Sequence, residues 1–202
     1  MDIFEMLLNE DSLEMGVNAI SIVEDPAIGL DFIALNDQSK VALAKVSEEK
    51  KILMGAALVP DKPIYRNQNG KEFYIYFSKD TIRKTAEMFF KNSNHKNATL
   101  EHEVQLKGMT VFESWIVEDS VHDKSAKYGL NYPEGTWVVT MKVDDDNIWN
   151  DYIKNEKVFG FSIEGQFANA LRSSEVNADL SDHEVSGALE KMKSILKEYY
   201  GN

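Results

Sequence analysis

The spacing of apolar residues changes several times along the chain, and each change marks a predicted element. Residues 79–91 repeat apolar side chains with helical spacing, and Ser78 just before them suits an N-cap. Strand-forming residues predict long strands at 109–118 and 136–143, which we expect to pair antiparallel. Residues 158–167 alternate between aromatic or aliphatic and polar positions, which is typical of a half-buried strand. The centre of the chain is therefore predicted to be rich in β-structure.

Shorter signals complete this centre. An apolar run at 52–59 and an aromatic run at 73–77 flank the turn-forming residues 67–70, which predicts a β-hairpin between the two runs. The acidic residues 144–146 suit the positive end of a helix dipole, and Trp149 belongs to the apolar face that follows. We interpret the acidic triplet as a helix start and not as a metal site.

The two ends of the chain are predicted to be appendages. Residues 1–37 indicate an irregular, partly extended arm with turns at Pro26 and Gly29, and residues 38–50 indicate a linker or weak helix. A polar stretch at 172–179 precedes a sequence with the spacing of a capping box. The amphipathic helix predicted after it has the apolar stripe Val185, Leu189, Met192, Ile195, Leu196 and Tyr199.

These signals predict three regions: an N-terminal arm and linker at 1–50, a β-rich domain at 51–170, and a linker with a C-terminal amphipathic helix at 171–202. A chain of 202 residues with 43% hydrophobic residues is long enough to fill one sizeable core. The sequence contains no internal repeat and no low-complexity tract. We therefore expect one domain with appendages.

Charge and cysteine content narrow the classes of function. The net charge of −12, from 34 acidic and 22 basic residues, disfavours nucleic acid as a partner, because binding to phosphates needs clustered Lys and Arg. The chain has no cysteine, so disulfides, thiolate nucleophiles and cysteine-ligated zinc are excluded. No signal peptide is visible at the N-terminus and no apolar run reaches about 18 residues, so we expect no membrane contact and a reducing cytoplasm.

His102 is the histidine that differs from the other three. His95 and His122 lie in polar loop sequence and His183 lies in the first turn of the predicted C-terminal helix, so all three are expected on the surface. His102 lies in a short segment, residues 100–104, that is expected to be extended. A histidine on a different element from a serine could take the proton of that serine. The alternative is an edge-strand histidine paired with a carboxylate.

Ser162 is a small residue on the polar face of the strand predicted at 158–167. Gly160 and Gly165 flank it and would let another backbone or a peptide approach closely. The alternative is an ordinary outward-facing strand serine, and the segment does not match the Gly-x-Ser-x-Gly elbow of α/β-hydrolases.

Glu113 is the candidate acid. Its face of the predicted strand is otherwise apolar, and a lone carboxylate there is costly unless it is paired. It could pair with an imidazole, or it could be a half-buried glutamate at the rim of a sheet. Glu164 is the rival acid, because it shares a strand face with Ser162.

Three motifs in this order resemble the prohead serine proteases of tailed phages, particularly the PBSX-like prophage branch. They are His102, the strand segment 113–117, and the segment 160–165 around Ser162. The N-terminal residues 18–28, followed by 32–35, resemble the leader of that branch. The resemblance covers residues 16–170 and leaves out the predicted C-terminal helix.

The resemblance implies an α+β fold similar to herpesvirus assemblin, a compact β-barrel of mainly antiparallel strands flanked by helices. Motif matching makes Ser162 the nucleophile and His102 the general base. Herpesvirus enzymes use a second histidine as the third member, whereas the phage branch uses an acid, for which we take Glu113. No cofactor and no metal are implied.

The implied function is a serine endopeptidase that cleaves scaffold and major capsid proteins, and itself, inside the assembling prohead in the bacterial cytoplasm. The alternative is a non-catalytic structural or scaffold-like head protein that retains the fold. In either case the C-terminal amphipathic helix could support self-association or docking on scaffold.

Overall fold

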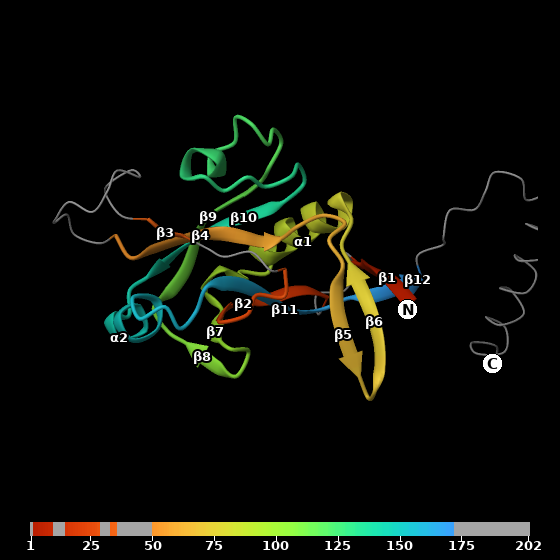
Figure 1. The fold of residues 1–202 in the computed structure, drawn as a ribbon, viewed down its shortest axis with the longest axis horizontal. Coiled ribbons are helices and arrows are strands. Elements are labelled where there is room, and N and C mark those ends of the chain that lie inside the picture. The colour runs from red at the N-terminus through yellow and green to blue at the C-terminus, as the bar shows by residue number, and fades with distance from the viewer. Residues whose placement is uncertain (1, 10–14, 29–32, 36–49, 172–202) are drawn as a thin grey trace, which may run out of the picture. The chain divides into compact units, whose positions relative to one another are not determined.

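The computed structural model describes residues 2–9, 15–28, 33–35 and 50–171. It has an α+β fold in which strands predominate and one long helix, α1, lies beside the sheets (Figure 1). No helix among the described residues is long and apolar enough to span a membrane. The predicted C-terminal helix and most of the linker at 38–50 lie outside the described residues.

The strands form three four-stranded sheets. The first has the order β12-β1-β6-β5, with bounds Ala168–Leu171, Asp2–Leu7, Lys71–Tyr76 and Ile64–Gln68. The second has the order β11-β2-β7-β8, with bounds Gly160–Gln166, Gly16–Val23, Ala98–Leu100 and Val104–Leu106. The third has the order β3-β4-β10-β9, with bounds Ile33–Leu35, Ile52–Leu58, Trp137–Val143 and Met109–Ile116.

The helical elements are α1, η1, η2, α2 and η3, with bounds Lys79–Lys91, Asn94–Lys96, Ser125–Tyr128, Asp146–Ile148 and Trp149–Ile153. The predicted helix at 79–91 is confirmed with its cap, because the Ser78 side chain accepts a hydrogen bond from the backbone N–H of Thr81. The helix packs Phe89 edge-on against Trp137 of β10, with ring centroids 5.4 Å apart, and both side chains are fully buried. This contact fastens α1 to the third sheet.

Two further predictions are confirmed. β9 and β10 pair antiparallel, as their long strand signals indicated. The acidic triplet begins a helix, because the Asp145 side chain accepts hydrogen bonds from the backbone N–H groups of Asn147 and Ile148, and Trp149 and Ile153 are buried after it.

The predicted β-hairpin is wrong in one of its strands. The turn at 67–70 does connect two paired strands, but they are β5 and β6. β4, the apolar run expected in that hairpin, pairs with β3 and β10 instead. Six of its seven residues are buried, which suits a central strand of a sheet better than a two-stranded ribbon.

The described residues do not close into the compact β-barrel that the resemblance implies. They form three separate sheets, and two of the strand pairs, β1 with β6 and β2 with β7, are parallel. Alternating apolar residues determine which face of a strand is buried, but they do not determine which strand it pairs with. The barrel came from the family resemblance and not from that pattern.

The N-terminal residues expected as an arm contribute strands to the sheets. β2 lies between β11 and β7, and seven of its eight residues are buried. Figure 1 shows β2 running alongside β11 through the centre of the described part. This central position matters for the site, because β11 on one side of β2 carries Ser162 and Glu164, and β7 on the other side leads into the turn with His102.

Candidate active site

Three hydroxyl-bearing residues lie in one row across the second sheet. Ser162 of β11 is the register partner of Ser21 of β2, which is in turn the register partner of Thr99 of β7. Register partners in neighbouring strands present their side chains on the same face of a sheet. The side chains are well covered, since Ser21 is fully buried and Ser162 is 8% exposed.

His102 lies in the turn between β7 and β8, two residues after β7 ends. The extended conformation expected for residues 100–104 is wrong at this point, because Glu101 and His102 have φ angles of 52° and 60° in the left-handed region. Side-chain alternation therefore does not apply here. The backbone N–H of His102 donates a hydrogen bond to the Ser21 Oγ atom at 3.1 Å, which places the turn over the hydroxyl row.

Glu164 is the carboxylate that contacts His102. Its Oε1 atom lies 3.1 Å from His102 Nδ1 and also accepts a hydrogen bond from the Thr99 hydroxyl. A carboxylate is only an acceptor, so this contact favours the imidazole tautomer with its proton on Nδ1. The lone pair of Nε2 is then available to take a proton.

Glu164 and Ser162 stand two residues apart on the same strand and therefore on the same face. At a rise of about 3.3 Å per residue their Cα atoms are about 7 Å apart, a span that one imidazole can bridge. Among the described residues no hydrogen bond joins the Ser162 hydroxyl directly to His102. Catalytic hydrogen bonds are often longer in a free enzyme than in its substrate complex.

A β-bulge lies directly beside Glu164. Glu164 pairs with Ala19 and Gly165 pairs with Val17, so Asn18 is the extra residue on β2. A Cβ atom on Gly165 would lie 2.1 Å from the backbone oxygen of Gly16, so only glycine fits there. The sequence indicated a close approach at Gly165, and the approaching backbone is that of β2. Bulges of this kind re-aim neighbouring side chains.

Glu113 lies on β9 in the third sheet and has different partners. Its Oε2 atom accepts a hydrogen bond from Thr140 at 2.9 Å and forms an ion pair with Lys124. Its side chain is 39% exposed, as expected for the rim position considered from the sequence. Partial burial raises the pKa of Glu113, but hydrogen bonds from Lys124 and Thr140 outweigh it and lower the pKa overall. The structure thus brings His102 to the rival acid Glu164.

The other histidines are placed differently. His122 is exposed and lies 2.8 Å from Asp119, whose pKa falls to about 2 because the side chain and backbone of His122 donate hydrogen bonds to it. His95 was expected to be solvated, but it is half-buried and stacks on Phe90. His183 lies outside the described residues.

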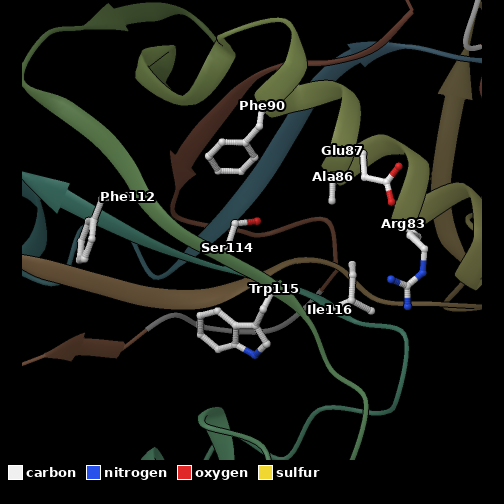
Figure 2. A pocket seen from close by; sticks show the side chains of 8 residues that line it. All are labelled: Arg83, Ala86, Glu87, Phe90, Phe112, Ser114, Trp115 and Ile116. Carbon is white, nitrogen blue, oxygen red and sulfur yellow. The ribbon is translucent and has the colours of Figure 1, made fainter.

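A groove of about 430 Å³ lies elsewhere, between α1 and β9 (Figure 2). It is lined by Arg83, Ala86, Glu87, Phe90, Phe112, Ser114, Trp115 and Ile116. Its one hydroxyl, that of Ser114, already accepts a hydrogen bond from Trp137 Nε1 at 2.8 Å. The lining contains no histidine, so the groove lacks the base that a serine nucleophile needs.

Ser21 and Thr99 are the residues of this site that sequence reasoning missed. Ser21 interrupts an apolar run and Thr99 lies in a three-residue strand, so neither spacing indicates chemistry. A polar residue inside a buried strand needs hydrogen bonds, and that requirement was the signal available for Ser21. Among the described residues there is no group of three or more acidic or histidine side chains that could hold a metal ion.

Comparison with known proteins adds one finding. The model of the family described as "Putative phage serine protease XkdF" matches residues 40–171, a range that includes Ser162, His102, Glu164 and Glu113. No curated protein and no solved structure matches the chain.

Proposed function

Because the chain belongs to this family of phage serine proteases, we propose that it is a head-maturation endopeptidase whose catalytic residues are Ser162, His102 and Glu164. The observation that carries the proposal is the distance of 3.1 Å between His102 Nδ1 and Glu164 Oε1. Glu164 lies two residues after Ser162 and on the same face of β11. A Ser-His-acid arrangement needs these three chemical types within reach of one imidazole.

Ser162, His102 and Glu164 each have a separate role in the proposed reaction. His102 Nε2 takes the proton of the Ser162 hydroxyl while Oγ attacks the carbonyl carbon of the substrate peptide. The C–N bond breaks, the proton passes from His102 to the leaving amine, and an acyl-enzyme on Ser162 remains. His102 then activates a water molecule that releases the acid. Glu164 keeps the ring oriented and stabilises the imidazolium that forms in each step.

Glu164 takes the place for which the sequence suggested Glu113. Glu113 forms its contacts with Lys124 and Thr140 on β9 and β10, whereas His102 contacts Glu164 on β11. An acid can orient an imidazole only through direct contact with it. The geometry therefore favours Glu164 as the third member.

The proposed substrates are scaffold and major capsid proteins inside the assembling prohead, with self-cleavage as a further reaction. The support is the phage family together with the accessibility of the base, since the His102 side chain is 41% exposed. A polypeptide can therefore reach the imidazole directly, whereas Ser162 is only 8% exposed.

A fluorophosphonate probe tests the chemistry, because it labels only an activated serine rapidly. We expect the purified full chain to be labelled at Ser162, as located by mass spectrometry of the labelled peptide. Ser162→Ala should abolish the labelling and His102→Ala should slow it at least about 100-fold. Ser120→Ala, which changes an exposed serine, is the matched control and should be labelled like the original chain.

Co-expression with the head proteins tests the substrates. The original chain should shorten the scaffold and major capsid proteins, and Ser162→Ala should leave them at full length. A chain that is folded but unlabelled at Ser162, and that leaves these proteins uncut, would instead establish a non-catalytic head protein.

A further inference from the structure

The turn that carries His102 is held by three hydrogen bonds, two to β2 and one to Glu24, the residue directly after β2. Ser21 Oγ accepts from the backbone N–H of His102 at 3.1 Å, and the backbone oxygen of Ile22 accepts from Glu101 at 3.1 Å. The backbone N–H of Glu24 donates to the Glu101 carboxylate at 2.6 Å. Of these three contacts, the one made by Ser21 reaches His102 itself.

The turn needs such support because its conformation is unfavourable. Glu101 and His102 are consecutive residues with positive φ, a region that residues other than glycine avoid for steric reasons. Such residues persist only where the surrounding structure holds them, and they concentrate at functional sites. β2 is the surrounding structure here.

The Ser21 hydroxyl can support the turn because it is itself fixed. It is fully buried, and it donates to the backbone oxygen of Thr99 at 3.3 Å, with the oxygen of Ile22 at 3.5 Å as a longer alternative. Its lone pairs then face the N–H of His102. A buried hydroxyl with both a donor and an acceptor partner has one preferred orientation.

We propose that Ser21 is a positioning residue for the catalytic base: its hydroxyl holds the backbone of His102 so that the imidazole lies between Glu164 and Ser162. This inference rests on the proposed function. Ser21 lies outside residues 40–171, so a segment beyond the matched region would complete the site. A small displacement of a catalytic group can cost about 100-fold in rate.

The test compares Ser21→Ala with Ser21→Thr, which keeps the hydroxyl, in the full chain. Two measurements are made on each: the rate of fluorophosphonate labelling at Ser162, and hydrogen exchange of the His102 backbone amide. For Ser21→Ala we expect labelling to slow by about 10-fold to 100-fold and amide exchange to accelerate at least about 10-fold. Ser21→Thr should recover most of both. With a peptide substrate, the loss should fall on kcat, with KM little changed.

A matched control is Thr136→Val, because the Thr136 hydroxyl is buried but has no hydrogen-bond partner among the described residues. This variant should change neither measurement. If Ser21→Ala does not fold, as judged by circular dichroism, Ser21→Cys replaces it, because the thiol has nearly the same shape and is a weak acceptor.

The outcomes separate the two hypotheses. Faster amide exchange with an unchanged labelling rate would show that the hydrogen bond exists but does not position the base, and unchanged exchange would refute the hydrogen bond. Either result overturns the inference and leaves the proposed function intact. A folded original chain that is not labelled at Ser162 overturns the proposed function, and the inference falls with it.

Discussion

Two strand glutamates of this protein have nearly the same surroundings and differ in one partner. Glu164 on β11 accepts a hydrogen bond from Thr99 of a nearby strand, and Glu113 on β9 accepts one from Thr140 of its neighbouring strand. Each lies beside a β-bulge: Asn18 is the extra residue near Glu164, and Phe112 is the extra residue near Glu113. The remaining partner is His102 for Glu164 and Lys124 for Glu113.

The difference between the partners decides what each glutamate can do. A lysine ammonium has an ordinary pKa far above neutral pH, so a lysine paired with a carboxylate holds two elements together and does not exchange protons with a substrate. An imidazole can take up and release a proton near neutral pH, so a carboxylate beside it can take part in proton transfer. A strand glutamate beside a threonine and a bulge therefore does not by itself identify a catalytic site. The residue that pairs with the glutamate must also be able to exchange a proton, as an imidazole can.

The largest effect on kcat should come from replacing Glu164 with glutamine, and the same replacement at Glu113 is the comparison. Glu164→Gln should lower kcat about 10³-fold, because a neutral amide can hold the ring but cannot stabilise the imidazolium. Glu113→Gln should leave kcat within about twofold. Steady-state kinetics on a peptide substrate measure both. If Glu113→Gln gave the greater loss, the third catalytic member would be Glu113 and the comparison would be reversed.

A substitution at the bulge beside Glu164 should lower the free energy of unfolding more than one at an exposed turn. Gly165→Ala places a Cβ atom against the backbone oxygen of Gly16 and should destabilise the fold by about 3 kcal/mol, because neither strand can move away without breaking the pairing. Gly70→Ala is the control: it has open space around it and should lose only about 1 kcal/mol to backbone strain. Urea denaturation compares the two, and equal losses would argue against the close approach.

The threonines offer a smaller test. Thr99→Val removes the hydroxyl that contacts Glu164 and should lower kcat by about 10-fold, since the carboxylate loses one of its two fixed partners. Thr140→Val removes the equivalent hydrogen bond to Glu113 and should not change kcat. Equal kinetics for the two variants would mean that Thr99 has no part in orienting Glu164.

The smallest effect concerns the pair formed by Glu113 and Lys124. Both side chains are about 40% exposed, so Glu113→Gln should cost less than about 1 kcal/mol at pH 7. The folded state lowers the pKa of Glu113, so its contribution is present above the ordinary glutamate pKa of about 4.3 and is lost as the pH falls below it. Thermal unfolding at pH 7 and pH 3 should show the difference shrinking, and a constant difference would contradict it.

Local signals in the sequence predicted local structure well. Ser78 and the apolar spacing after it predicted α1 with its cap, and strand patterns predicted the pairing of β9 with β10. Partners distant in sequence were harder to predict: β4 pairs with β3 and β10, and the expected barrel is replaced by three sheets. An alternating strand carries no information about its neighbours beyond the face that it buries.

In the candidate site, too, the sequence indicated individual residues but not the contacts between distant ones. Ser162 and His102 could be singled out from the sequence, although their catalytic roles came from a family resemblance and remain predictions. Glu113 stood out because a carboxylate on an apolar strand face looks costly, but a lysine eleven positions later satisfies it. The contact between His102 and Glu164 depends on a left-handed turn and a bulge, and neither leaves a periodic signal.

The position of β2 also determines when the site can form. Its antiparallel pairing with β11 joins segments from opposite ends of residues 2–171, and its parallel pairing with β7 spans more than 70 residues; strands with such distant partners fold slowly. During synthesis β2 leaves the ribosome before β11. The two strands cannot pair until β11 has also emerged, because long-range contacts form only when both partners are present. A nascent chain that stops short of β11 lacks both Ser162 and Glu164. The proposed catalytic site is thereby among the last parts of the molecule to assemble, which would delay its action until the folded unit is complete.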